Sequence, residues 1–257
     1  SSVVWCMGIT QHHVGTANVR ALCILQLALG NIGVAGGGAN IYRGHDNVQD
    51  ATDVGPNPDS LPGYYGLAEG AWKHFANAWG VDYNWLLSRY GSKELMEKPG
   101  MTVSRWFDGV LERNDYVDQP SNLRAVLYWG HAPNSQTRLP DMKEAMQKLD
   151  LLVVIDPYPT ATAAMHGRQD GVYLLPATTQ FETSGSVTAS NRSLQWRERV
   201  IQPLFECKTD QEIMYLFAKK FGFANEFCKN IKVVHNEPVI EDILREINRS
   251  CWTIGYT

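Results

Sequence analysis

Arg43 and the polar residues that follow it form the stretch of this chain with the clearest capacity for chemistry. Residues 43–53 read RGHDNVQDATD and bring a guanidinium, an imidazole and several amides and carboxylates together. An arginine stays charged at any working pH, and its planar fork of donors matches a carboxylate or a phosphate. The segment therefore indicates a site for a small anion, with a solvated surface linker as the alternative interpretation.

The glycines before Arg43 favour the site over the linker. Residues 30–44, GNIGVAGGGANIYRG, contain six glycines. Glycine has no side chain to bury and loses more backbone entropy on ordering than any other residue. A loop that accepts this cost is typical of a backbone that must lie close to a ligand.

A strand, a polar turn and a helix are expected before this loop. Residues 2–7 are β-branched and aromatic, which predicts a short buried strand, and the turn of residues 8–15 carries HH after TQ. Neighbouring histidines point in different directions on regular elements, so polar contacts to a ligand are favoured over a zinc site. Residues 16–29 are apolar almost all round and predict a buried helix that stops at Gly30.

Residues 125–155 give the most definite prediction of structure. AVLYW (125–129) and LLVVI (151–155) are typical of strands, and residues 139–149 are typical of a helix between them. This pattern predicts a crossover in a parallel sheet, where ligands bind at the carboxyl ends of the strands. Polar residues follow both strands: Gly130, His131 and Asn134 after the first, and Asp156, Tyr158 and Thr160 after the second.

Asp156 is the most informative of these strand-end residues. A carboxylate directly after a strand can accept paired hydrogen bonds from ribose hydroxyls or from the N–H edge of guanine. The chain has no G-x-G-x-x-G segment, so an ordinary nicotinamide site is poorly supported. A turn in which Asp156 and Pro157 merely end the strand is the alternative.

The remaining segments carry less chemistry. Residues 56–121 are rich in tryptophan and predict a helical insertion used for packing or for contact with another subunit. A strand is expected over residues 172–175, followed by a loop rich in Ser, Thr and Asn. This loop either binds a phosphate-bearing ligand or is a plain surface loop; its candidates are Glu182, Thr188, Asn191 and Arg192. Asp210 is expected to cap a packing helix, and residues 237–248 predict a second one.

Composition excludes several classes of function. The 257 residues carry a formal net charge of −4, with a sequence pI near 6.0 and no run of Lys or Arg, so nucleic-acid binding is excluded. The five cysteines are scattered without a C-x-x-C pair, which argues against a disulfide framework, a zinc site or an iron–sulfur site. The longest apolar run, residues 21–29, is too short to cross a bilayer.

Together these motifs resemble the large (alpha) subunit of molybdenum- or tungsten-dependent formate dehydrogenases, in the dimethyl sulfoxide reductase family of molybdopterin oxidoreductases. The matching segments are MGITQH, residues 30–55, GHAPNSQT, VIDPYPT and LLPATTQFETSGSVTASNR, and RGHDNVQ is the most specific element. They run in order over most of the chain except the tryptophan-rich insertion. The resemblance implies an α/β fold of Rossmann-like parallel sheet layers with helices on both faces, as part of a multidomain molybdopterin oxidoreductase.

The resemblance also implies roles for individual residues. Arg43 matches the active-site arginine that orients formate, and His45 stands beside it, so these two are the expected catalytic residues. Further positions match those that bind a bis(molybdopterin guanine dinucleotide) cofactor, with Asp156 facing a guanine. The expected cofactor-binding residues are Gly8, Thr10, Gln11, His12, Gly44, Gly130, His131, Asn134, Asp156, Tyr158, Thr160, Asp170 and Asn191.

The same resemblance implies a division of the chain into four parts. Residues 1–55 would end one α/β domain with the glycine-rich active-site loop, and residues 56–121 would be the helical insertion. Residues 122–180 would form the unit that binds the pterin guanine dinucleotide. Residues 181–257 would supply a polar cofactor loop and peripheral helices.

The implied reaction is the reversible oxidation of formate to CO2 at molybdenum or tungsten. The chain is expected to be an internal piece of the catalytic subunit, because it has no Cys-His pair to match the metal-ligating cysteine or selenocysteine and its adjacent histidine, and no motif for the [4Fe-4S] cluster. The expected partners are the rest of that subunit, iron–sulfur electron-transfer subunits and a flavin or NAD subunit. The cytoplasm is the expected compartment, with a periplasmic, membrane-associated complex as the alternative.

Two other functions stay open at the level of sequence. One is another molybdopterin oxidoreductase, such as a nitrate reductase. The other is a non-catalytic scaffold in which residues 130–160 bind a nucleotide and the glycine-rich loop only shapes an interface.

Overall fold

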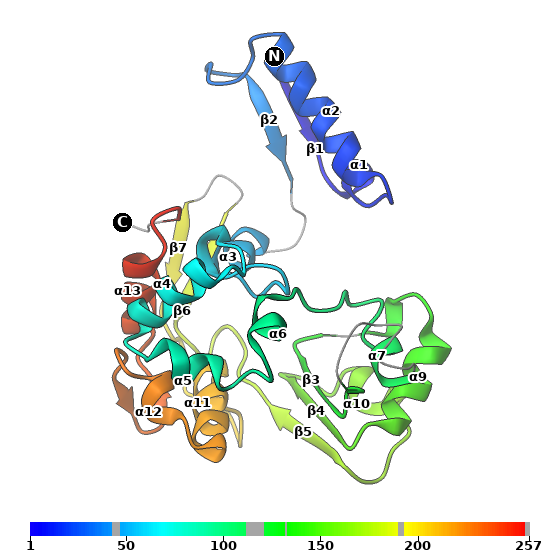
Figure 1. The fold of residues 1–257 in the computed structure, drawn as a ribbon, viewed down its shortest axis with the longest axis vertical. Helices are drawn as coiled ribbons and strands as arrows, with labels where there is room; N and C mark the ends of the chain where they lie inside the picture. Colours follow the sequence, from blue (N-terminus) through cyan, green and yellow to red (C-terminus); the bar gives the residue numbers. More distant parts are fainter. Residues whose placement is uncertain (43–46, 112–120, 132, 190–192, 255–257) are drawn as a thin grey trace.

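The computed structural model describes residues 1–42, 47–111, 121–131, 133–189 and 193–254 (Figure 1). In these residues, parallel strands with helices packed against them are joined to helical segments and short antiparallel ribbons. The expected α/β class is therefore confirmed. None of the described helices is both long enough and apolar enough to cross a membrane.

The first unit is a strand–helix–strand crossover. β1 (Ser2–Trp5) pairs in parallel with β2 (Gly38–Ile41), and α1 (Met7–Thr10) and α2 (Gly15–Ala28) connect them. α2 begins at a glycine for a steric reason, since a Cβ on that residue would lie 2.1 Å from the carbonyl oxygen of Thr10. The expected order of strand, turn, helix and glycine-rich loop is present.

The burial expected for the helix in this unit is wrong. Within α2 only Gly15 and Gln26 are buried, whereas Ile24 and Leu27 keep 57% and 63% of their surface exposed. The reason lies in the arrangement of the unit, because a sheet of two strands covers only one side of a helix. Figure 1 shows β1 and β2 along one side of α2.

The second unit is a three-stranded parallel sheet in the order β3-β4-β5. Its strands are β3 (Ala125–Trp129), β4 (Leu151–Asp156) and β5 (Val172–Pro176). α9 (Leu139–Lys148) connects β3 to β4, and α10 (Thr162–Met165) lies between β4 and β5. The crossover expected from residues 125–155 is thus present with nearly the expected boundaries.

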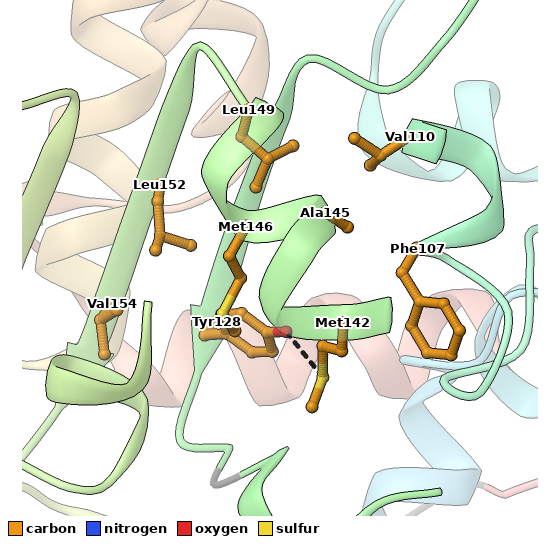
Figure 2. Packing of buried hydrophobic residues seen from close by; sticks show 9 residues of the cluster. All are labelled: Phe107, Val110, Tyr128, Met142, Ala145, Met146, Leu149, Leu152 and Val154. Carbon is orange, nitrogen blue, oxygen red and sulfur yellow. Dashed lines mark hydrogen bonds between the residues drawn. The ribbon is translucent and has the colours of Figure 1, made fainter. Parts of the chain in front are cut away.

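β4 is buried on both faces, as its unbroken apolar sequence predicts. Leu152 and Val154 pack in one cluster with Met142 and Met146, which lie on the buried face of α9 (Figure 2). Val153 and Ile155 point to the opposite face and join Ala177, Ile213 and Phe217. Helices therefore cover both faces of this sheet, because successive side chains of a strand alternate between faces.

Short helices form most of the described part of residues 47–111. Trp72, Phe75 and Met96 are buried there in one cluster with Cys251 and Ile254. The tryptophan thus serves packing, and its indole N–H donates to the Met96 carbonyl at 3.1 Å. The elements are α3 (Val48–Val54), η1 (Pro62–Tyr64), α4 (Glu69–Trp79), α5 (Tyr83–Leu87), α6 (Lys93–Glu97) and α7 (Asp108–Leu111).

The last part of the chain combines two antiparallel ribbons with three helices. Figure 1 places these helices near α4 and α5. The ribbons are β6 (Gly185–Thr188) with β7 (Leu194–Arg197), and β8 (Val233–Val234) with β9 (Glu237–Pro238). The helices are α11 (Asp210–Phe221), α12 (Ala224–Phe227) and α13 (Ile240–Ser250).

Two expectations for this region are corrected. Thr209, and not Asp210, caps α11, since its hydroxyl oxygen accepts from the Glu212 N–H at 3.4 Å. Asp210 is the first residue of the helix and accepts from the indole N–H of Trp129 at 2.6 Å. The helix expected over residues 237–248 begins at Ile240, because the two residues before Val239 belong to β9.

A buried carboxylate joins the helical part of the chain to the second unit. Asp108 is 1% exposed and accepts from Arg138 Nη1 and Nη2 at 2.9 and 2.7 Å, while Arg105 Nε lies 2.5 Å away. Arg138 precedes α9 and has a φ of 59°, and its guanidinium lies 4.6 Å from the ring centroid of Phe107. The Arg138 guanidinium holds the pKa of Asp108 below its ordinary value.

Replacing Asp108 by Asn tests this link. We expect Asp108→Asn to lower the free energy of unfolding by about 2 kcal/mol at pH 7, because hydrogen bonds to a charged group are lost while the shape is kept. The folded pKa is depressed, so the stabilisation is complete above the ordinary pKa of an aspartate and is lost as the pH falls through the folded value. The difference between the two proteins should therefore shrink in acid.

The measurement is urea denaturation at several pH values, with amide hydrogen exchange of α9 as the local readout. Asp141→Asn is the matched control, because Asp141 pairs with the same arginine at 2.9 Å but is 44% exposed. Equal exchange of α9 in the two variants would contradict the assigned role of Asp108.

Candidate functional site

The carboxyl ends of β3, β4 and β5 form the candidate site. Because the three strands are parallel, the residues that follow them meet at one edge of the sheet. The Gly130 N–H donates to the Ile155 carbonyl at 2.8 Å, and the Ala177 N–H donates to the Asp156 carbonyl at 3.2 Å. The structure thus brings together the ends of β3 and β4, where the sequence placed candidate ligand-binding residues, and adds the end of β5, which was expected as a strand.

His131 is fixed at this edge by three contacts. Its carbonyl accepts from the hydroxyl of Thr162 at 2.6 Å, and its Nε2 lies 2.6 Å from Nε2 of Gln136. Its ring stacks on Tyr128, with the ring centroids 5.8 Å apart. Tyr128 is itself buried against Met142 (Figure 2), and burial raises the pKa of its phenol. The imidazole is therefore held on a rigid support and is only partly accessible.

Asp156 is half-buried at the end of β4 and organises the following turn. Its Oδ1 accepts from the Tyr158 N–H at 3.2 Å, which agrees with the turn suggested by Asp156 and Pro157. Its Oδ2 has no hydrogen-bond partner among the described residues. One oxygen of the carboxylate therefore stabilises the turn, and the other is available to a hydrogen-bond donor from a ligand. The Tyr158 side chain is exposed.

Three buried oxygen atoms near this edge have no partner in the described part of the chain. They are Oε1 of Gln136, Oγ1 of Thr160 and Oγ1 of Thr178. Buried polar atoms are paired in the great majority of cases, since an unmade hydrogen bond costs about 1–3 kcal/mol. The three residues follow β3, β4 and β5 respectively, so the edge offers a set of unpaired polar groups to a ligand.

Gln136 and Thr178 were not singled out from sequence. Thr178 follows β5 as Asp156 follows β4, so the rule that ligands bind at strand ends could have found it. Gln136 has no such pattern, because its place depends on the path of the loop after β3. Asn134 lies on that loop in η2 (Pro133–Ser135) and is exposed.

Asp170 is not brought to this edge. It precedes β5, whereas the other strand-end residues follow their strands, so it lies at the opposite edge of the parallel sheet. Its carbonyl accepts from Arg168 Nε at 3.2 Å. Its assignment to the cofactor stays a prediction that the geometry of this sheet does not support.

The expected residues of the first unit lie in and after α1. Thr10 donates through its hydroxyl to the Cys6 carbonyl at 3.3 Å, and His12 Nε2 lies 2.8 Å from the Gly8 carbonyl oxygen. Gly8, Thr10, Gln11 and His12 are all exposed. Among the described residues, no group of three or more His, Cys, Asp or Glu could hold a metal ion.

Arg43, Gly44, His45 and Asn191 lie outside the described residues, so their roles stay predictions. The segment that follows Arg43 is described from Asn47 onward, and several of its polar residues serve structure. Asp53 is buried and accepts from Gln49 Nε2 at 2.8 Å and from the Tyr64 hydroxyl at 2.5 Å. These groups hold α3 against η1 and are not free for a ligand.

The polar loop after β5 is also tied to the structure. Glu182 is buried and accepts from the Thr179 N–H, the Thr179 hydroxyl and the Leu204 N–H, all within 2.8 Å, and these donors lower its pKa. The N–H of Thr188 donates to Asn47 Oδ1 at 2.9 Å. Glu182 is thus a structural acceptor, while Thr188 places β6 beside the segment that follows Arg43.

Thr162 is the anchor of the His131 loop, and its hydroxyl can be removed without changing the side-chain shape. We expect Thr162→Val to lower the free energy of unfolding by about 1 kcal/mol, because the partly buried His131 carbonyl loses its donor. Amide hydrogen exchange over residues 130–137 should accelerate, whereas Thr162→Ser keeps the donor and should exchange as the unmodified protein does. Equal protection of this loop in the Val and Ser variants would remove Thr162 from the support of the site.

Comparisons with known proteins match most of the chain. The family model for molybdopterin oxidoreductases matches residues 1–220. The F420-dependent formate dehydrogenase subunit alpha of Methanocaldococcus jannaschii is 30% identical over 250 residues, which cover 97% of this chain and 32% of that protein. Formate dehydrogenase H of Escherichia coli is 30% identical over 225 residues, covering 87% of this chain and 28% of that protein.

The formate dehydrogenase-O major subunit of Escherichia coli is 29% identical over 304 residues, covering 96% of this chain and 29% of that protein. The chain therefore spans about a third or less of the length of these relatives. Among solved structures, the acetylene hydratase of Pelobacter acetylenicus superposes with a TM-score of 0.40 at 16% identity, over 63% of this chain and 20% of that one. That structural likeness is too weak to support an argument.

Proposed function

The chain belongs to the molybdopterin oxidoreductase family, and on this premise we propose that it is part of the catalytic subunit of a formate dehydrogenase. In this proposal the whole protein oxidises formate to CO2, reversibly, at a molybdenum or tungsten centre held by two molybdopterin guanine dinucleotides. The similarity to several formate dehydrogenase subunits supports the choice of substrate. The segment RGHDNVQ, residues 43–49, which resembles the substrate-binding segment of formate dehydrogenases, also supports it.

The observation that carries the proposal is the set of unpaired polar atoms at the strand-end site. Gln136, Thr160 and Thr178 offer buried oxygens without partners among the described residues, and Asp156 keeps one carboxylate oxygen free. A guanine dinucleotide has the N–H groups, hydroxyls and phosphates that such a set can bind. A Cβ at Gly130 would meet no atom within 4 Å, so space for a ligand remains beside the end of β3. The residues present therefore fit the nucleotide part of the cofactor.

The cofactor, when bound, supplies the two-electron redox chemistry of its metal. The contribution of this chain is electrostatic and positional. Arg43 holds the carboxylate of formate with a charge that is in place before the reaction begins, which favours a small anionic substrate. His45 stands beside it as a group able to hold or move a proton. No described residue is assigned as the metal ligand.

The remaining parts of the proposal concern partners and location. The full subunit would hold a [4Fe-4S] cluster to carry electrons to iron–sulfur subunits, and a flavin or NAD subunit would be a further partner. The proposed compartment is the cytoplasm.

Analysis of the purified full-length protein tests the proposal directly. We expect molybdenum or tungsten together with about two guanine-dinucleotide pterins per subunit, and reduction of a viologen dye that depends on formate. A folded protein with metal and pterin that oxidises reduced viologen with nitrate, and does not reduce the dye with formate, would assign it to a different reaction of the family. Absence of both metal and pterin would favour the nucleotide-binding scaffold.

Arg43 provides the sharper test of mechanism. We expect Arg43→Ala to lower kcat/KM for formate at least about 100-fold, since a preorganised charge beside the reacting group is lost, while metal and pterin contents stay unchanged. Arg20→Ala is the matched control, because Arg20 lies exposed on α2. Formate turnover that survives in Arg43→Ala at the level of the control would exclude Arg43 from the mechanism.

A further inference from the structure

A cavity of 390 Å³ lies in the helical part of the chain, between helices that are far apart in sequence. Residues of α4, α5, α11, α12 and α13 line it, and Figure 1 shows these helices gathered together. Its volume falls within the range of about 300–1,000 Å³ found for small-molecule sites. The cavity is thus large enough for a small organic molecule, and neither the family nor the proposed reaction assigns it a ligand.

Aromatic side chains form much of the cavity wall. Trp79 and Trp85 line it from α4 and α5, and Phe223 and Phe227 line it from the region of α12. None of these four is fully buried, and Phe227 is exposed. An aromatic wall that stays accessible to solvent favours a ligand with an apolar body.

Two carboxylates give the cavity a charge preference. Glu226 on α12 and Glu246 on α13 both line it. Glu226 has no hydrogen-bond or ion-pair partner among the described residues. Glu246 is 14% exposed and accepts from Asn230 Nδ2 at 2.9 Å, with Arg249 Nη2 only at 3.7 Å. Burial raises the pKa of Glu246, which indicates that its charge is poorly solvated and would gain from a nearby cation.

Among the aromatic residues of the wall, Trp85 already attracts a cation. The guanidinium carbon of Arg89, a residue that does not line the cavity, lies 5.5 Å from the ring centroid of Trp85. Aromatic faces attract cations through the ring quadrupole. Carboxylates add attraction for a cation and repel an anion, so the two features of the wall select the same class of ligand.

We propose that this cavity binds a small organic cation with an apolar body, whose charged group lies near Glu226 and Glu246 and whose apolar part packs on Trp79, Trp85 and the two phenylalanines. The negative charges of Glu226 and Glu246 would repel formate and other small anions from the cavity. This inference is independent of the proposed reaction and does not need the redox cofactor.

Calorimetry on the full-length protein tests the proposal with three probes of similar size. They are benzyltrimethylammonium as the cation, benzyl alcohol as the neutral probe and phenylacetate as the anion. We expect the cation to bind with a Kd about tenfold or more below those of the other two, because cation–aromatic attraction and the carboxylates act on it alone. Equal affinity for the three probes would make the cavity a non-selective apolar site, and no binding of the cation would also overturn the proposal.

Two variants assign the affinity to this cavity. Glu226→Gln keeps the side-chain size and should weaken binding of benzyltrimethylammonium about threefold to tenfold. Trp85→Leu should weaken it to a similar extent by removing an aromatic face. Glu206→Gln is the control, because Glu206 is exposed and does not line the cavity. Circular dichroism establishes that each variant is folded, and an unchanged Kd in folded Glu226→Gln would overturn the proposal.

Discussion

The parallel pairing of β4 with both β3 and β5 is the constraint on which the candidate site depends. β4 can occupy the centre of its sheet only because Leu152 and Val154 face α9 while Val153 and Ile155 face α11. Once this strand is buried on both faces, the ends of three strands must emerge at one edge. Residues separated by up to about fifty positions, from Gly130 to Thr178, are thereby placed in one loop cluster.

The polar residues of the chain divide into those that build the protein and those left for a ligand. Asp53, Asp108 and Glu182 are buried, and each accepts at least two hydrogen bonds from neighbouring groups. Thr160 and Thr178 instead have buried hydroxyls without partners among the described residues. Residue type alone does not separate these groups, since a carboxylate or a hydroxyl suits either task. The division depends on which donors the fold brings within reach.

The sequence was a good guide where local pattern and burial coincide. The apolar run of β4 and the helical spacing of α9 can be recognised without knowing which segments they contact. Both elements have nearly the expected bounds. The prediction from sequence was wrong for α2. Its apolar residues predicted burial, but the two-stranded sheet covers only one side of the helix and leaves most of these residues exposed. The prediction also failed at Asp210, because a carboxylate at the start of a helix can turn to a distant indole when a threonine precedes it.

The sequence by itself determined the α/β class, the strand–helix–strand unit and the family, because hydrophobic periodicity and the ordered motifs are properties of short segments. It also pointed to Asp156 and Thr160, since both follow a recognisable strand. Only the tertiary structure decided that Gln136 and Thr178 join them and that Asp170 lies at the opposite edge. Only the tertiary structure shows that one cavity is lined by α4, α5, α11, α12 and α13. The physical reason is that contacts between segments depend on strand order and loop path, which no local spacing of residues specifies.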